Sequence, residues 1–527
     1  MGPLLLGLLT ASPSLAQDEP EEKIPLDFSL EGYYRVRLHH FNGLYDPDFT
    51  GWENEPGTGR YTQQRLRLEP TVAYKDLAKF TFQADLFNDV LFGDNEDLAS
   101  TALFAEQPSM TGLDGQPTAP FTMRRAWMEF NAKVGVVRVG RQPSHWGLGV
   151  LANDGNGFRN TWGEAHGGAT FDRFLFATRP IAVVQGITKK EGPDIPLFVI
   201  FAVDRLVEDP LTQYYGYKCS DDPEDTDHAD CEDDEDHSYT EARNTAARAP
   251  NWWTEHEDDV IEFVYAVLYK GEGLDLAGAP ADLTAGFYAV NRRQLETSSN
   301  VWILDAYAKL DHRNIYFEGE GVTILGHSSA ITLPDPSNEA DPLAKTPKIW
   351  NAVGRLGYEL DKVGVIFESG FASGDDNVSD EVFTGRPINP DYNVGLILYE
   401  EVISRVSAAR WTASGRGLWS NGGVYNSVYT FPSVRVTPLD NVDVIAAFLV
   451  AWPHKPDGAV IRLDEDAESN ILGWEADLAV KARLHEHVLL SFEGGYARVT
   501  DRLPTADVGL AMNDRVWTIQ ARAAYEF

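Results

Sequence analysis

The chain ends in a segment whose hydrophobic and polar residues alternate one by one. In V-W-T-I-Q-A-R-A-A-Y-E-F, one parity holds Trp517, Ile519, Ala521, Ala523, Tyr525 and Phe527, and the other holds Val516, Thr518, Gln520, Arg522, Ala524 and Glu526. Successive side chains of a β-strand point to opposite faces, so one face of this strand is predicted to be apolar with aromatic ends and the other mostly polar. This pattern is typical of a strand that separates lipid from water.

The same alternation recurs in segments along the whole chain. It predicts strands at 27–41, 61–74, 79–91, 121–131, 136–142, 169–177, 197–206, 260–270, 283–292, 301–311, 315–325, 348–360, 364–372, 424–436, 442–452, 472–483, 488–499 and 516–527. Ile181–Thr188 is ambiguous, and we place it in a connection because this preserves an even number of strands. A β-propeller or β-helix would require a sequence repeat of constant period, and we find none.

The connections between these segments alternate between short and long. Short ones include 75–78, 311–314, 361–363, 438–441 and 485–487, and long ones lie near 42–60, 92–120, 143–168, 207–259, 326–347, 373–423, 453–471 and 500–515. Bacterial outer-membrane barrels have short periplasmic turns and long extracellular loops. We therefore predict an all-β fold, a single antiparallel transmembrane β-barrel of about 18 strands (roughly 16–20).

The N-terminus predicts export. A short apolar core, Leu4 to Leu9, is followed by small residues up to Ala16, so residues 1–16 are predicted to be a signal peptide. The usual basic start is missing, which leaves the true translation start open. Residues 17–26 are then a short periplasmic segment and 27–527 the barrel. No other segment approaches the ~18 consecutive apolar residues of a transmembrane helix.

Location and partners follow from these predictions. We expect the outer membrane of a Gram-negative bacterium, contact with outer-membrane lipid, and recognition of the closing strand, through Phe527, by the barrel-assembly machinery. The mean hydropathy of −0.29 fits a barrel with one apolar face, and the 11% of aromatic residues suits membrane–water boundaries. The net charge of −37 argues against a nucleic-acid partner, because phosphate contacts require a basic surface.

Much of the negative charge is local. Eleven carboxylates lie between Asp221 and Asp236, which predicts an exposed extracellular loop. The two cysteines, Cys219 and Cys231, are expected to form a disulfide there in an oxidising compartment, and two free thiols are the alternative. The spacing of the acids matches no EF-hand, so a solvated loop is favoured over a divalent-cation site, and we predict neither a metal nor a cofactor.

Parity also predicts an unusually charged interior. Inward arginines on neighbouring strands should form a basic arc, made of Arg35, Arg37, Arg65, Arg67, Arg125, Arg138 and Arg522, with Glu129 beside them. The opposite arc should be acidic and contains Asp305, Glu318, Glu320, Glu368, Glu475, Asp477 and Glu493, interrupted by Lys481 and Arg483. Burial of so many charges in a dry core would cost several kcal/mol each, so we favour a water-filled channel over a barrel plugged by internal ion pairs.

Two stretches resemble a known family. V-R-V-G-R-Q-P-S-H-W-G-L-G-V-L-A-N-D-G with G-A-T-F-D-R-F-L-F-A-T, and F-A-S-G-D-D-N-V-S-D at Phe371 to Asp380, are similar to patterns of the alginate-export family of porin-like outer-membrane barrels. The segment Asn389 to Val402 also resembles a loop of uncharacterised barrels of myxobacterial type. The resemblance implies an ~18-stranded barrel with a basic lumen for anionic polysaccharide, to which Arg125, Arg138 and Arg141 would contribute, although Arg141 lies on the outward parity.

These observations favour an outer-membrane channel that passes small polar or anionic solutes, acidic saccharides among them, by passive diffusion. A surface adhesin or structural barrel is one alternative, and a barrel-embedded hydrolase is the other. The sequence contains neither G-x-S-x-G nor H-E-x-x-H. Ser144 and His145 are adjacent on an extended chain and should point apart, so we predict that the protein is not an enzyme.

Overall fold

The computed structural model describes most of the barrel and part of its loops. The described residues are 25–44, 58–91, 121–165, 168–189, 192–208, 260–294, 298–328, 346–376, 381–407, 420–455, 467–503 and 514–527 of the 527-residue chain. The predicted signal peptide 1–16, the acidic loop, Cys219 and Cys231 lie outside them.

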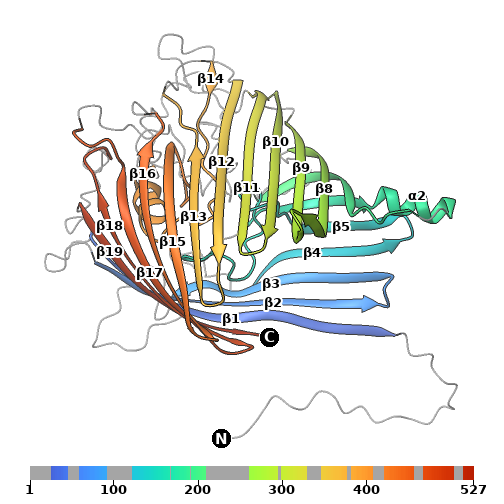
Figure 1. Cartoon of the computed structure of the whole chain (residues 1–527), viewed down its shortest axis with the longest axis horizontal. Helices are drawn as coiled ribbons and strands as arrows, with labels where there is room; N and C mark the ends of the chain where they lie inside the picture. Colours follow the sequence, from blue (N-terminus) through green and yellow to red (C-terminus); the bar gives the residue numbers. More distant parts are fainter. Residues whose placement is uncertain are drawn as a thin grey trace, which may run out of the picture.

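Eighteen strands form one closed antiparallel barrel (Figure 1), because each long strand pairs with its neighbours in sequence and β19 pairs with β1. Glu526 lies opposite Tyr33, and the backbones of Phe527 and Gly32 exchange two hydrogen bonds of 3.0 Å. The two-residue strand β14, Val382–Phe383, pairs only with β12 and is parallel to it. The strands of the wall are β1 Leu26–Asn42, β2 Thr58–Tyr74, β3 Ala78–Leu91, β4 Phe121–Ala132, β5 Gly135–Pro143, β6 Thr170–Thr178, β7 Leu197–Glu208, β8 Ile261–Leu276, β9 Ala279–Gln294, β10 Ser299–His312, β11 Ile315–His327, β12 Thr346–Glu359, β13 Val363–Ala372, β15 Ser427–Leu439, β16 Val442–Pro453, β17 Gly473–His485, β18 Val488–Val499 and β19 Arg515–Glu526.

The predicted fold class is confirmed, and each of the eighteen predicted segments coincides with one strand of the wall. Ile181–Thr188 falls in the β6–β7 connection, as predicted, and forms the helix α2, Pro180–Thr188. The largest difference in bounds is the β8–β9 hairpin, which continues to a turn at Ala277 and Gly278, both with positive φ. Residues 271–282 carry little apolar alternation, which is why the sequence pattern ended early there.

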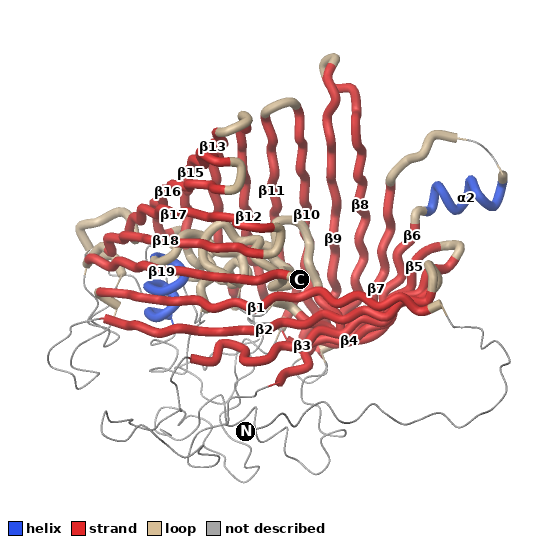
Figure 2. Tube along the Cα trace, turned by 90° about the horizontal axis from the view of Figure 1, so that it is seen from below, coloured by secondary structure: helices blue, strands red, loops and turns tan. Residues whose placement is uncertain are grey.

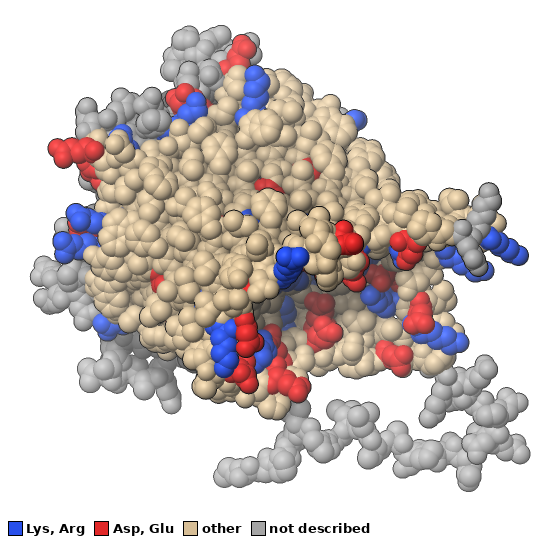
Figure 3. All heavy atoms as spheres, viewed as in Figure 1, with Lys and Arg blue, Asp and Glu red and all other residues tan. Residues whose placement is uncertain are grey.

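The outer surface of the barrel is apolar, as the parity of the strands predicts. Phe367, Leu478 and Phe492 are each more than 50% exposed although they lie in the middle of strands. Figure 3 shows a broad face on which charged side chains are sparse, while they gather at its edges and in a hollow beneath it. Exposed aromatic residues lie near both ends of the strands. The end that carries the short turns has Phe28, Phe80, Phe130, Phe317, Tyr358 and Tyr525, and the end that carries the long loops has Trp302, Trp350, Trp452 and Tyr496.

The interior is packed more tightly than a simple pore. Two connections fold into the lumen: the first inner loop, residues 144–169 between β5 and β6, and the second inner loop, residues 384–407 between β13 and β15. Their apolar side chains, among them Val150, Trp162, Ile397 and Tyr399, join a buried cluster with inward residues of the strands. Within the described ranges, no helix is long and apolar enough to cross a membrane.

Candidate functional site

One side of the first inner loop is held by carboxylates on the barrel wall. Glu320 on β11 accepts backbone N–H bonds from Leu148 (2.5 Å), Gly149 (3.1 Å), Val150 (3.1 Å) and Leu151 (3.3 Å). Asp305 on the neighbouring β10 accepts a bond of 3.1 Å from the indole N–H of Trp146. Successive N–H groups that converge on one carboxylate satisfy backbone donors that would otherwise be buried without partners.

The other side of the first inner loop is held by the basic arc. Arg35 binds Glu164 through both of its oxygens, at 3.1 and 2.8 Å, and both side chains are buried. Arg522 donates to the carbonyl of Gly163 (3.2 Å), whose N–H donates to Glu493 (2.9 Å). The inward arginines therefore converge, as the parity predicts, but they converge on a loop.

The charge of Glu164 depends on these arginines. Burial by itself would raise the pKa of Glu164, but Arg35, Arg37, Arg522 and Arg65 outweigh burial and lower the pKa below its usual value. Glu164 is therefore ionised at neutral pH and acts as the counter-charge of the arc.

The second inner loop is anchored in the same way. Glu475 on β17 accepts backbone N–H bonds from Leu396 (2.6 Å), Ile397 (2.9 Å) and Leu398 (2.7 Å). A π-helical turn, Leu398–Ile403, follows directly and buries Tyr399, whose hydroxyl lies 2.9 Å from Ser427 Oγ. Anchoring of a helical turn by a carboxylate at its N-terminus follows the capping logic of ordinary helices.

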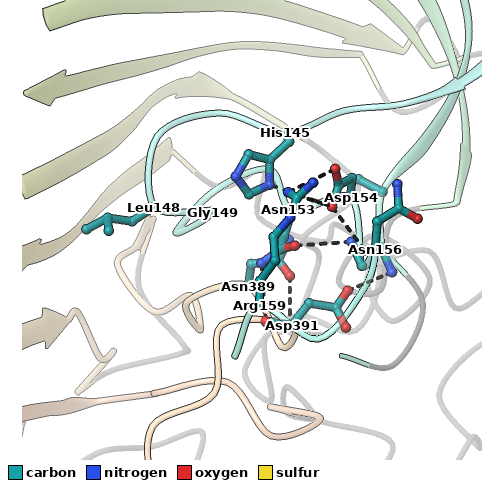
Figure 4. Close-up of polar contacts among 12 residues, drawn as sticks. His145, Leu148, Gly149, Asn153, Asp154, Asn156, Arg159, Asn389 and Asp391 are labelled. Carbon is teal, nitrogen blue, oxygen red and sulfur yellow. Dashed lines mark hydrogen bonds and ion pairs between the residues drawn. The ribbon is translucent and has the colours of Figure 1, made fainter. Parts of the chain in front are cut away.

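The two inner loops also bind each other inside the barrel (Figure 4). Asn389 donates from its backbone to Val150 (2.9 Å) and from its side chain to Leu151 (3.0 Å). Asn153 donates to the carbonyl of Asp391 (3.2 Å), and the carboxylate of Asp391 accepts the N–H of Gly168 (2.6 Å). The loops thus form one hydrogen-bonded unit that narrows the lumen, a feature the sequence did not predict.

A cavity of about 110 Å³ remains between this unit and the wall. Two strands supply three facing pairs of lining residues, Arg35 with Arg65, Arg37 with Gln63, and His39 with Tyr61, and β19 adds Gln520. The inner loops supply Gly163, Glu164, Ala165, Asn393, Leu396, Glu400 and Glu401. A cavity of this size has room for several waters or a small organic solute.

Several inward arginines lie directly opposite another arginine on the neighbouring strand. Arg35 lies directly opposite Arg65 in the β1–β2 ladder, and Arg37 lies directly opposite Arg522 in the β1–β19 ladder. Directly opposed like charges destabilise a sheet. Glu164 and Glu493 offset part of this repulsion, with Arg37 and Arg522 each 3.7 Å from one of these carboxylates.

The remaining predicted residues lie elsewhere on the inner wall. Arg67 binds Asp85 at 2.7 and 2.8 Å, and Arg125 donates to the carbonyl of Asp154 (2.8 Å) in the first inner loop. Nearer the short turns, Arg138 pairs with Glu129 (2.6 Å). On the acidic side, Tyr307 donates to Glu318 (2.6 Å), and Arg355 and Tyr429 each donate to Glu368 at 2.7 Å.

Arg141 is a correction to what the family resemblance implied. It faces outward and pairs with the exposed Asp172 on β6, with both bonds at 2.9 Å, so it does not contribute to a basic lumen. Its parity in the strand already indicated this orientation.

Ser144 and His145 have different partners. The hydroxyl of Ser144 accepts a bond from Arg173 (3.3 Å), while His145 lies 3.9 Å from Asp154. Among the described residues, no group of three or more His, Cys, Asp or Glu side chains is arranged to hold a metal ion.

The acidic residues that line the cavity were not predicted from the sequence. Glu164, Glu400 and Glu401 lie in connections, where strand parity assigns no face. The glycines at 147, 149, 155, 157 and 163, all with positive φ, were a sequence signal for a tightly folded loop at 144–169.

Comparisons with known proteins give a fold likeness only. No family model and no curated protein sequence match the chain. Similar solved structures include Acinetobacter baumannii OccAB3 (TM-score 0.48, 10% identity, 94% of this chain and 99% of that one) and Pseudomonas aeruginosa OccK9 (TM-score 0.48, 11% identity, 94% and 98%). A BenF-like porin from Pseudomonas fluorescens Pf-5 has a TM-score of 0.47 and 8% identity over 95% of this chain and 98% of that one. At such identities no residue role is transferred to this chain.

Proposed function

We propose that this chain is an outer-membrane channel of a Gram-negative bacterium that passes small polar or anionic solutes by passive diffusion. The observation that carries the proposal is the cavity inside the closed barrel. Beside this cavity, the barrel wall places arginine opposite arginine in two strand ladders. Because directly opposed like charges destabilise a sheet, we infer that these arginine pairs are retained for a function of the cavity.

The exterior supports a membrane location. Exposed leucine and phenylalanine side chains in mid-strand would be unfavourable in water but suit lipid. Exposed aromatic residues at both strand ends match the two boundaries of a bilayer, where a ring can be buried while its polar atom stays hydrated. As part of the same proposal, residues 1–16 act as a signal peptide for export, and the barrel-assembly machinery recognises the closing strand through Phe527.

The cavity favours anions only moderately. Arg35 is engaged by Glu164, whereas Arg37 lies farther from that carboxylate and is the arginine better placed to meet a solute. Glu400 and Glu401 border the same cavity and oppose a large excess of anions. The site thus suits a small solute that carries a carboxylate and several hydroxyl groups, as an acidic saccharide does, in line with the resemblance to alginate-export barrels.

Conductance tests the proposal and separates it from an adhesin or a hydrolase barrel. Purified protein in a planar bilayer should give discrete current steps, and a KCl gradient should give a reversal potential on the anion-selective side of zero. Addition of glucuronate should reduce the chloride current more than equimolar glucose does. A folded protein that gives no current steps would contradict the channel.

A further inference from the structure

Helix α2 leaves the barrel at the end that carries the short turns (Figures 1 and 2). The helix begins at Pro180, directly after Arg179, which follows the last residue of β6. It ends at Thr188, and the next residue, Lys189, has a left-handed backbone conformation. A proline in the first turn and a left-handed residue after the last turn are ordinary start and stop signals of a helix. No residue of this helix is buried, and Val184 and Ile187 are 58% and 71% exposed.

The helix is too apolar and too short to be stable in water alone. Val183, Val184 and Ile187 are spaced as i, i+1 and i+4, which places them on one stripe. On a different side, Gln185 donates to the carbonyl of Pro193 (3.1 Å) and ties the helix to the returning chain. A nine-residue helix rich in β-branched residues is marginal unless its apolar stripe is covered.

The apolar exterior of the barrel continues up to this helix. Phe176, Phe201 and Tyr265 face outward in one row across β6, β7 and β8, and the next row toward α2 contains Thr178, Val199 and Val267. The guanidinium of Arg179 lies 5.5 Å from the ring of Phe198 and pairs with Asp194. The stripe of α2 therefore begins within a few residues of the surface that we assign to lipid.

We propose that α2 is an interfacial anchor, with Val184 and Ile187 in the acyl boundary of the leaflet on the short-turn side. Lys189, next to the C-terminal end of the helix, carries a charge that phospholipid phosphates attract, whereas Arg179 at the other end is paired with Asp194. This proposal rests on the proposed membrane location of the barrel, but it adds a contact that a channel does not require. The occupant is phospholipid; a second copy or another protein would cover the stripe differently.

A fluorescent label can locate the helix. In a background of Cys219→Ser and Cys231→Ser, the Ile187→Cys variant is labelled with the environment-sensitive dye NBD in vesicles of phosphatidylethanolamine and phosphatidylglycerol. Lipids with a nitroxide near the top of the acyl chain should quench the label about two-fold, because the stripe lies at that depth. Phe367→Cys on the outer wall is the lipid-facing control, and Glu486→Cys in the β17–β18 turn is the aqueous control.

The outcomes separate the two proposals. Quenching at 187 and 367 but not at 486 supports the anchor. Quenching at 367 alone, with the 187 label open to aqueous iodide, overturns the anchor and leaves the membrane barrel intact. A 187 label protected from both iodide and nitroxide lipid means that protein covers the stripe, which also overturns the proposal. Absence of quenching at 367 contradicts the membrane location itself.

Discussion

At the scale of single residues, the parity of a strand predicts direction but not partner. Arg35, Arg37, Arg65 and Arg522 all face inward as the alternation predicts. The carboxylate that these arginines surround, Glu164, lies in a loop more than a hundred residues from Arg35 in sequence, and no local pattern links the two. Inward orientation was thus predictable from sequence, whereas the division of arginines into loop anchors and cavity lining required the fold.

Arg37 is the arginine whose loss should change selectivity with least damage to the loop. Arg37→Gln should shift the reversal potential in a KCl gradient toward cations. One unit charge about 8 Å from an ion in water changes the energy of an anion and of a cation by ~0.5 kcal/mol each, in opposite directions, so the ratio of anion to cation permeability should fall by up to roughly six-fold. Arg141→Gln, which removes an outward arginine, is the matched control and should change nothing. An equal shift in both variants would show that the effect is not local to the cavity.

Glu164 predicts an acid-dependent loosening of the first inner loop. Because its folded pKa is lowered, its contribution to loop anchoring is complete above its ordinary pKa of about 4.5 and is lost as the pH falls through the lowered value. Single-channel noise and mean conductance should therefore increase below about pH 4. The Glu164→Gln variant should show raised noise already at pH 7 and a smaller change on acidification; an unchanged acid response in that variant would contradict this role.

At the scale of elements, the strands were predictable and the inner loops were not. The strands are recognisable from the alternation of apolar and polar residues, because one face of each strand meets lipid and the other does not. The inner loops have no such period, and their folding depends on Glu320 and Glu475, which read in sequence only as inward acids. Helix α2 was placed correctly in a connection, on the evidence of the even number of strands, although its helical form was not predicted.

Removal of the Glu475 carboxylate should release the second inner loop. Glu475→Ala would leave the N–H groups of Leu396, Ile397 and Leu398 without their acceptor, at about 1–3 kcal/mol for each that stays buried. The loop should therefore move, and single-channel conductance should rise while the barrel remains folded.

Asp172→Asn serves as the control, because it removes an outward carboxylate from the same barrel. Circular dichroism and resistance to unfolding in detergent would verify the fold of both variants. A conductance that stays at the wild-type value in folded Glu475→Ala would show that this loop does not limit the current.

At the scale of the whole molecule, closure is the decisive step. The barrel closes where β19 meets β1, at the two ends of the described chain, so the closing contacts join residues almost 500 positions apart. Such long-range pairing is slow and costs loop-closure entropy. Phe527 contributes two backbone hydrogen bonds to Gly32 and places its ring next to that glycine.

Deletion of Phe527 should therefore impair assembly more than it impairs the finished fold. The expected result is a reduced fraction of heat-modifiable, protease-resistant barrel in the outer membrane of an expression host. Phe527→Tyr, which keeps an aromatic ring, should assemble normally. Equal assembly of the deletion and the wild type would contradict the role given to the terminal residue.

The central claim is that solutes cross the barrel through the cavity between the arginine wall and the inner loops. The most direct test introduces one cysteine there, Gln63→Cys, in the background of Cys219→Ser and Cys231→Ser, and applies a negatively charged methanethiosulfonate reagent during single-channel recording. Leu38→Cys, which is 52% exposed on the outer face of β1, is the matched control. Modification at position 63 is expected to reduce the current and shift selectivity toward cations, while modification at position 38 leaves both unchanged. A current that is unaffected after complete modification at position 63, verified by mass spectrometry, would contradict a solute path through this cavity.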